Sequence, residues 1–194
     1  MSRIACRALF GEILNGTLRP NEVIQEAKLA VDLGLSRTPI REAIGRLEGE
    51  GFVVRNGRTV LAQDLTLTAY LEIIHVRRLL ECEVAGLAPP PRPRRIAKAD
   101  LLNMRNEVET SSEDAGAEAH WMGDSKIHDM IVRASGNDLL AHNVGALRRR
   151  TLLFGRYRLS GRLRNGQAEH LAIIDAILAE DREATQSAMR TTWT

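Results

Sequence analysis

An aspartate and a histidine lie four residues apart in the second half of the chain. Asp124 and His128 fall on the same helical stripe as Trp121 and Ile131, so both polar side chains are expected to face inward. A carboxylate oxygen and an imidazole nitrogen one helical turn apart can converge on one metal ion. A simple hydrogen bond between the two side chains in a helical core is the alternative. The spacing alone leaves both interpretations open.

An arginine occupies an apolar stripe on an earlier segment. Ile73, Leu80 and Val84 define this stripe, and Arg77 falls on it by 4-3-4 spacing. A guanidinium buried without a partner is very unfavourable, so Arg77 needs an anion. Glu81, one turn later, is one candidate. A bound carboxylate is the other, because a guanidinium can hold a carboxylate through two parallel hydrogen bonds.

Arginines near the N-terminus indicate a different chemistry, the binding of nucleic acid. Apolar residues at helical spacing form an inward stripe, namely Ile40, Ala43, Ile44 and Leu47. The rest of the segment carries Arg37, Arg41 and Arg46. Guanidinium groups at the exposed start of a helix can contact guanine edges or phosphates in a major groove.

Turn signals define the helix that carries these arginines. Thr38 offers a side-chain oxygen as the N-cap, and Pro39 suits the first helical position, where its missing N–H costs nothing. We expect this helix to end at Gly49 or Gly51.

A β-hairpin is expected next. The dipeptide Asn56-Gly57 separates two β-prone runs, which favours a type I′ turn, and Arg55 and Arg58 flank its tip. Each feature alone also fits an ordinary helix and hairpin. Their order and spacing together predict a winged helix-turn-helix that binds DNA.

The remaining elements are expected to be helical. A helix over residues 3–14 with Ile4, Leu9 and Ile13 inside, and a positioning helix over 25–32, complete a DNA-binding domain at residues 1–62. Residues 63–67 form a linker, and residues 68–194 form an all-α bundle. Its helices are predicted over 68–88, 98–109, 115–134, 138–159, 167–180 and 182–192, with a proline run at 89–93 closing the first. The predicted fold class is mostly α with a small β-hairpin wing.

Composition restricts the environment of the chain. The net charge is only +2, so specific DNA binding has to depend on local geometry and on dimerisation rather than on bulk charge. Two cysteines without a Cys-x-x-Cys motif fit a reducing cytosol. There is no apolar run of about 18 residues and no signal-peptide pattern, so we expect a cytoplasmic protein without a membrane partner.

The basic segment resembles the GntR family of bacterial transcription regulators. The motif reads LGLSRTPIREA from Leu33 to Ala43, followed by Leu47, Glu50 and Gly51. The resemblance implies binding to operator DNA, and we assign the contacts to Ser36, Arg37, Thr38, Arg41, Arg46, Gly57 and Arg58. The family often has an arginine in the positioning helix where this chain has Ala27.

The helical half resembles the FCD-type ligand-binding domain of the FadR-like branch of that family. The segment VRRLLE, residues 76–81, resembles the motif whose arginine lines an effector pocket, which implies that Arg77 contacts a small carboxylate effector. His170 stands in a Glu-His pair that resembles the segment whose histidine joins Asp124 and His128 around a divalent metal ion (zinc, nickel or manganese). Thr192 stands where the family usually has a fourth ligand.

These observations predict a transcription regulator that binds a near-palindromic operator as a homodimer and responds to a small organic acid. We expect a repressor, although the residues do not distinguish repression from activation, and we expect no catalytic residues. One alternative is a metal-dependent hydrolase using Asp124, His128 and His170. Another is a regulator whose bundle only dimerises, with a closed hydrogen-bond network inside. His120, one turn before Asp124, is a candidate for the missing ligand.

Overall fold

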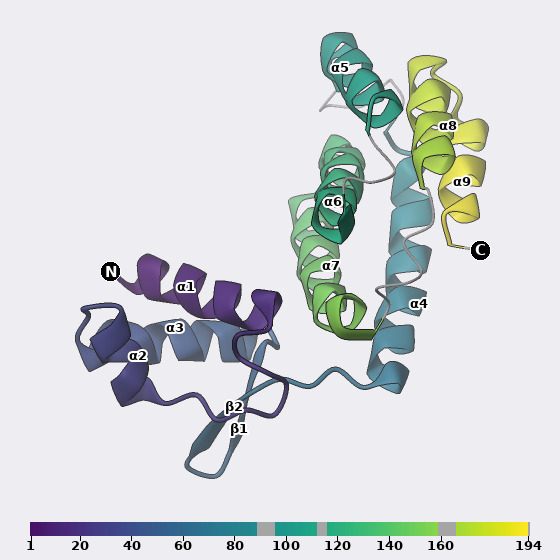
Figure 1. The fold of residues 1–194 in the computed structure, drawn as a ribbon. Coiled ribbons are helices and arrows are strands. Elements are labelled where there is room, and N and C mark those ends of the chain that lie inside the picture. Colours follow the sequence, from purple (N-terminus) through teal and green to yellow (C-terminus); the bar gives the residue numbers. More distant parts are fainter. Residues whose placement is uncertain (89–95, 112–115, 159–165, 194) are drawn as a thin grey trace. The chain divides into compact units, whose positions relative to one another are not determined.

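A computed structural model describes residues 1–88, 96–111, 116–158 and 166–193 (Figure 1). The side chains of residues 116–122 and 155–158 lie outside this description, and so does the proline run at 89–93. The described chain is mostly helical with one two-stranded antiparallel sheet, which confirms the predicted fold class. It divides into two compact units. The first contains residues 1–70 and 149–158, and the second contains residues 71–148 and the C-terminal helices.

The first unit begins with three helices and a β-hairpin. Its elements are α1 (Ser2–Asn15), α2 (Glu26–Asp32), α3 (Arg37–Gly49), β1 (Val53–Asn56) and β2 (Thr59–Ala62). Both α1 and α2 pack against α3, which buries the predicted stripe of α3 completely. The buried side of α1 is Ala5, Leu9 and Ile13. Ile4 was expected there but is exposed, because the regular spacing of four residues places Ala5 on the inner face instead.

The start of α3 differs from the prediction by two residues. Ser36 is the N-cap residue, with an extended backbone, and the helix begins at Arg37. Thr38 is therefore inside the helix rather than its cap, and Pro39 is the third helical residue. This position also tolerates proline, because the first four N–H groups of a helix have no intrahelical acceptor. The helix ends at Gly49, as expected, and Gly51 follows with φ of +79°.

The wing forms as a β-hairpin, as predicted, but its turn lies one residue later than the expected turn at Asn56-Gly57. Asn56 pairs with Thr59, so Gly57 and Arg58 are the central turn residues. Only Gly57 has a positive φ, at +59°, which fits a type II′ turn rather than the expected type I′ turn. In this register Val53 pairs with Ala62, and both of these side chains are buried. A turn centred on Asn56-Gly57 would pair Val53 with Val60, which is also buried, so burial of Val53 alone does not distinguish the two registers.

Six further helices follow the wing in the part of the chain that the structure describes. They are α4 (Leu67–Ala85), α5 (Lys98–Glu109), α6 (Gly116–Ala134), α7 (Asp138–Arg158), α8 (Gln167–Leu178) and α9 (Arg182–Thr191). In the second unit α8 packs on α9 and on α5 (Figure 1). Its core is aliphatic, with Ile127, Ile131, Val144, Ile173 and Ile174 fully buried. No described helix is both long and apolar enough to span a bilayer.

Candidate functional site

Charged and polar side chains meet inside the second unit, beside its aliphatic core. We call this group the polar cluster: Arg77 and Glu81 on α4, Asp124 and His128 on α6, Arg148 on α7 and His170 on α8. Arg77, Glu81, His128 and Arg148 are buried, and Asp124 and His170 are partly buried. Four helices therefore converge on one set of ionisable groups, and each group needs a partner there.

Glu81 is the centre of the first half of the polar cluster. Nε of Arg77 donates to Oε1 of Glu81 at 2.8 Å. Of the two partners expected for Arg77, Glu81 and a bound carboxylate, the structure therefore shows Glu81. Oε2 of Glu81 contacts Nδ1 of His128 and accepts from Nη1 of Arg148 at 3.3 Å. Burial by itself raises the pKa of Glu81, but the hydrogen bond with His128 and the charges of His128, Arg77 and Arg148 lower it to about 2.

Asp124 is the centre of the second half. Its Oδ1 lies 3.4 Å from Nε2 of His128 and 3.3 Å from Nε2 of His170, and its Oδ2 accepts from Nη2 of Arg148 at 2.6 Å. Burial raises the pKa of Asp124, but the charge of His128, the hydrogen bond with His170 and the charge of Arg148 together hold this pKa well below its ordinary value. Both acidic groups of the polar cluster are therefore carboxylates at neutral pH.

The geometry of Asp124, His128 and His170 fits a divalent metal ion. Each offers one ligand atom, and the three atoms lie within 4.8 Å of one another. Metal–ligand bonds of about 2.0–2.1 Å in tetrahedral arrangement place neighbouring ligand atoms about 3.3–3.4 Å apart. The distances from Oδ1 of Asp124 to both histidine nitrogens match this separation. Nδ1 of His128 is also held by Glu81, as is usual for a metal-binding histidine.

Thr192, at the position expected for a fourth ligand, uses its side chain for another contact. The hydroxyl of Thr192 donates to the backbone carbonyl of Met189 at 2.8 Å, so it is used at the end of α9. The side chain of His120, the suggested substitute, lies outside the described residues. The described residues thus supply three protein ligands rather than four.

Sequence reasoning missed Arg148 and half of the role of Glu81. Arg148 joins the carboxylates of Glu81 and Asp124, and Glu81 orients His128 in addition to pairing with Arg77. The signal for Arg148 was present, because Val144, Arg148 and Thr151 follow the same 4-3 spacing that singled out Arg77, and all three are buried. A polar residue on a buried stripe was again the informative feature.

The first unit presents the other candidate site on α3. Ser36, Arg37, Thr38 and Arg41 are all exposed, at the N-terminal end of the helix. Arg37 and Arg41 are one turn apart and share a side. Nε of Arg41 donates to the carboxylate of Glu26 on α2 at 2.9 Å, while the Arg41 side chain remains 67% exposed. Such a contact at Nε fixes the side chain and leaves the two Nη groups at its tip facing outward.

Arg46 does not share this side of α3. It lies nine residues after Arg37, which is two and a half turns, so its side chain leaves the opposite side of the helix. Nε of Arg46 donates to Glu50 at 3.0 Å, and the charge of Arg46 lowers the pKa of Cys6 on α1, against the larger rise caused by burial. Arg46 therefore points away from the side of α3 that carries Arg37 and Arg41.

The wing lies next to the side of α3 that carries Arg37 and Arg41. Nη2 of Arg55 lies 3.4 Å from the carboxylate of Glu48, which is on that side of the helix. Gly57 and Arg58 are exposed at the tip of the hairpin. The head of α3 and the wing thus form one basic face.

Comparison with known proteins agrees with this arrangement. The model of bacterial regulatory proteins of the gntR family matches residues 3–59, and the model of the FCD domain matches residues 72–193. The Nta operon transcriptional regulator of Aminobacter aminovorans is 30% identical over 169 residues, which cover 85% of this chain and 77% of that protein. The gluconate operon transcriptional repressor of Bacillus licheniformis is 27% identical over 132 residues, covering 68% of this chain and 54% of that protein.

Solved structures show the same fold. Escherichia coli McbR/YncC matches with a TM-score of 0.77 at 20% identity, covering 99% of this chain and 92% of that one. A GntR regulator from Rhodococcus sp. RHA1 matches with a TM-score of 0.74 at 20% identity, with 99% and 93% covered. The relatives and structural neighbours are transcription regulators, so the hydrolase alternative is not supported. This chain belongs to the GntR family of bacterial transcription regulators and carries an FCD domain after its winged helix-turn-helix.

Proposed function

We propose that this regulator is an operator-binding repressor whose affinity for DNA is set by a small organic acid bound at the polar cluster together with a divalent metal ion. The observation that carries the proposal is the convergence of Asp124, His128 and His170 beside the buried guanidinium of Arg77, with Oδ1 of Asp124 at 3.4 Å and 3.3 Å from the two histidine nitrogens. The repressor role is supported by the gluconate operon repressor of B. licheniformis, whose name also points to an organic acid.

The basic face of the first unit supports operator binding. In helix-turn-helix proteins the N-terminal residues of the recognition helix reach base edges in the major groove. Arg37 and Arg41 are at that end of α3, and both are exposed. We assign base contacts to these two, and phosphate contacts to Ser36, Thr38 and the wing residues Gly57 and Arg58. Arg46 remains a weaker candidate, for a flanking phosphate, because it leaves the other side of the helix.

A dimer follows from the size of this face. One recognition helix and one wing read only a few base pairs, which is too little for a useful specificity ratio in a genome. Two copies related by a two-fold axis read two half-sites and so require a near-palindromic operator. We therefore propose a homodimer as the binding species.

Charge in the polar cluster supports an anionic effector. Two arginines and two carboxylates balance each other when both histidines are neutral. A divalent cation held by Asp124, His128 and His170 would add two positive charges to a buried site. These charges would favour the binding of an anion in addition to Glu81 and Asp124. A carboxylate is the anion that Arg77 binds best. Such an acid changes operator affinity to the extent that it binds the DNA-bound and free conformations differently.

Three measurements test the proposal on protein without an affinity tag. Metal analysis is expected to find close to one divalent ion per chain in the wild type and much less in His170→Ala. Selection from a pool of random duplexes is expected to yield a near-palindromic site. Organic acids such as gluconate or citrate are expected to change the affinity for that site in the wild type but not in His170→Ala. Full metal retention in His170→Ala would remove His170 from the site.

The mutual pairing of these groups also supports a second candidate, a regulator whose bundle only dimerises. In that case the polar cluster is a closed hydrogen-bond network that needs no ligand. Neither metals nor organic acids would then shift the thermal unfolding of the wild type, whereas the first proposal requires a shift with both.

A further inference from the structure

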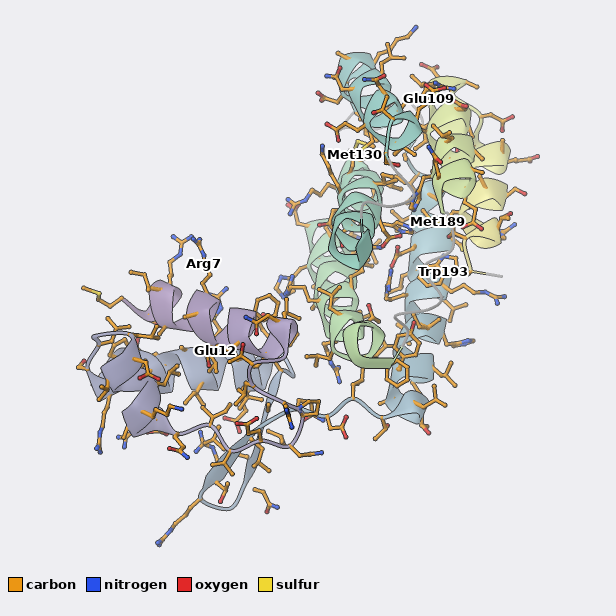
Figure 2. All side chains as sticks on the ribbon, viewed as in Figure 1. Arg7, Glu12, Glu109, Met130, Met189 and Trp193 are labelled. Carbon is orange, nitrogen blue, oxygen red and sulfur yellow. The ribbon has the colours of Figure 1, made fainter. Side chains whose placement is uncertain are left out.

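The indole of Trp193 carries a buried donor without an acceptor. Trp193 follows α9 near the C-terminal end of the described chain (Figure 2). Its ring packs against the core of the second unit, and Nε1 is fully buried with no hydrogen-bond partner among the described residues. An indole nitrogen is only a donor, and buried Trp N–H groups usually find an acceptor. Leaving one unsatisfied costs the protein the desolvation free energy of the group. The feature therefore calls for an acceptor that the described residues do not supply.

The indole adjoins the polar cluster. The guanidinium carbon of Arg77 lies 4.8 Å from the centroid of the Trp193 ring, which is a cation–π contact. The ring also meets the imidazole of His128 edge-on, with centroids 6.2 Å apart and an interplanar angle of 83°. One aromatic side chain thus touches the residue that we assign to the effector and one of the residues that we assign to the metal.

The acidic groups of the polar cluster are already engaged. Oε1 of Glu81 accepts from Arg77, and Oε2 contacts His128 and Arg148. Oδ1 of Asp124 lies near both histidines, and Oδ2 accepts from Arg148. Each of the four carboxylate oxygens therefore has its own partners, and none of these is Trp193.

We propose that the Nε1–H of Trp193 donates a hydrogen bond to the carboxylate of the effector, next to the charge of Arg77. This inference rests on the proposed function, because it needs an organic acid at the polar cluster.

A donor at this place has a consequence for specificity. The indole N–H can only donate and Arg77 is a cation, so the site favours a deprotonated carboxylate over a neutral amide or ester of the same shape. The ligand class is therefore a small carboxylate that presents one oxygen to Trp193.

The indole N–H gives a direct spectroscopic test. Uniformly 15N-labelled protein has two indole signals, from Trp121 and Trp193, and Trp121→Phe assigns them. Zinc-loaded protein is titrated with acetate, gluconate and citrate, against sodium chloride of equal ionic strength. We expect the Trp193 signal to move downfield with the acid that binds, because a hydrogen bond to a carboxylate deshields the proton, and to stay in place with chloride.

Affinity supplies the second measurement. Trp193→Phe keeps an aromatic face for Arg77 but removes the donor, and is expected to bind the same acid about 10- to 100-fold more weakly. Trp121→Phe makes the same substitution at the other tryptophan of the chain, and we expect it to weaken acid binding less than Trp193→Phe does. Calorimetric unfolding shows whether the Trp193→Phe variant is folded.

The outcomes separate the two proposals. If the wild type binds none of the acids, the proposed function fails and this inference fails with it. If the wild type binds an acid while the Trp193 signal stays in place, the inference fails and the proposed function stands. The same holds if Trp193→Phe is folded and binds like the wild type. The spectroscopic result on the wild type is decisive even if the Phe variant does not fold.

Discussion

Glu81 and His128 are joined inside the second unit by a contact between Oε2 and Nδ1, which leaves Nε2 of the imidazole facing Asp124. Partners of this kind fix the tautomer and ring orientation of a metal-binding histidine. We therefore predict that Glu81→Gln lowers the affinity for zinc about 10- to 100-fold, because the amide is a weaker acceptor and leaves the ring less restrained. Competition with a chromophoric chelator measures it. Glu83→Gln, an exposed change on α4, is the control.

Acid stability depends on the same carboxylate. The pKa of Glu81 is about 2 in the folded protein, below its ordinary value of 4.5, so the unfolded chain takes up the proton first. The stability that Glu81 contributes is complete above about pH 4.5 and is lost as the pH falls towards 2. In metal-free protein, the difference in free energy of unfolding between wild type and Glu81→Gln should shrink from pH 7 to pH 3. Urea unfolding at each pH measures this difference. A difference that is the same at pH 7 and pH 3 would mean that the charge of Glu81 does not contribute to stability.

The helical half could be predicted closely because its signals are local. Helix α5 has the predicted bounds, and the stripe containing Arg77 and Val84 is buried as its spacing indicated. The proposed sharing of one site by Asp124, His128 and His170 came from the family resemblance, since no spacing links His170 to α6. Their ligand atoms do meet in the structure.

The rest depends on tertiary contacts that no local pattern carries. That Arg148 of α7 connects Glu81 to Asp124 depends on how three helices pack together. The wing turn lies one residue later than the turn dipeptide indicated, and β2 also forms backbone hydrogen bonds outside the hairpin, between Ala62 and both Asn21 and Glu22. The N-cap of α3 is Ser36 rather than Thr38. Pro39 did not determine the cap, because proline is tolerated at any position of the first helical turn.

Stability of the winged helix depends on the inner side of α3. Ile44 is fully buried, so Ile44→Ala should lower the free energy of unfolding by about 2–5 kcal/mol through lost burial and a residual cavity. Val31→Ala on α2, where the side chain is 80% exposed, should change it by less than about 0.5 kcal/mol. Urea unfolding of both variants checks this. Equal effects would show that α3 does not pack as described.

The last prediction concerns Arg41 and Arg46, which differ in direction although both are exposed arginines of α3. Arg41 lies on the basic face, and Glu26 holds its Nε so that its tip points outward. Arg41→Ala should therefore cost about 1–3 kcal/mol of operator binding and relax the base preference at one position of each half-site. Arg46→Ala removes the same charge from the opposite side, and should keep the base preference of the wild type and cost less affinity than Arg41→Ala.

Quantitative footprinting on the selected operator, at several salt concentrations, distinguishes these two arginines. Loss of a base contact changes the preference for one base, whereas loss of a phosphate contact weakens all sequences alike and lowers the salt slope by about one. If Arg46→Ala loses affinity while Arg41→Ala footprints like the wild type, the DNA-binding face is not the one that carries Arg37 and Arg41. The side of α3 that carries Arg46 would then face the DNA.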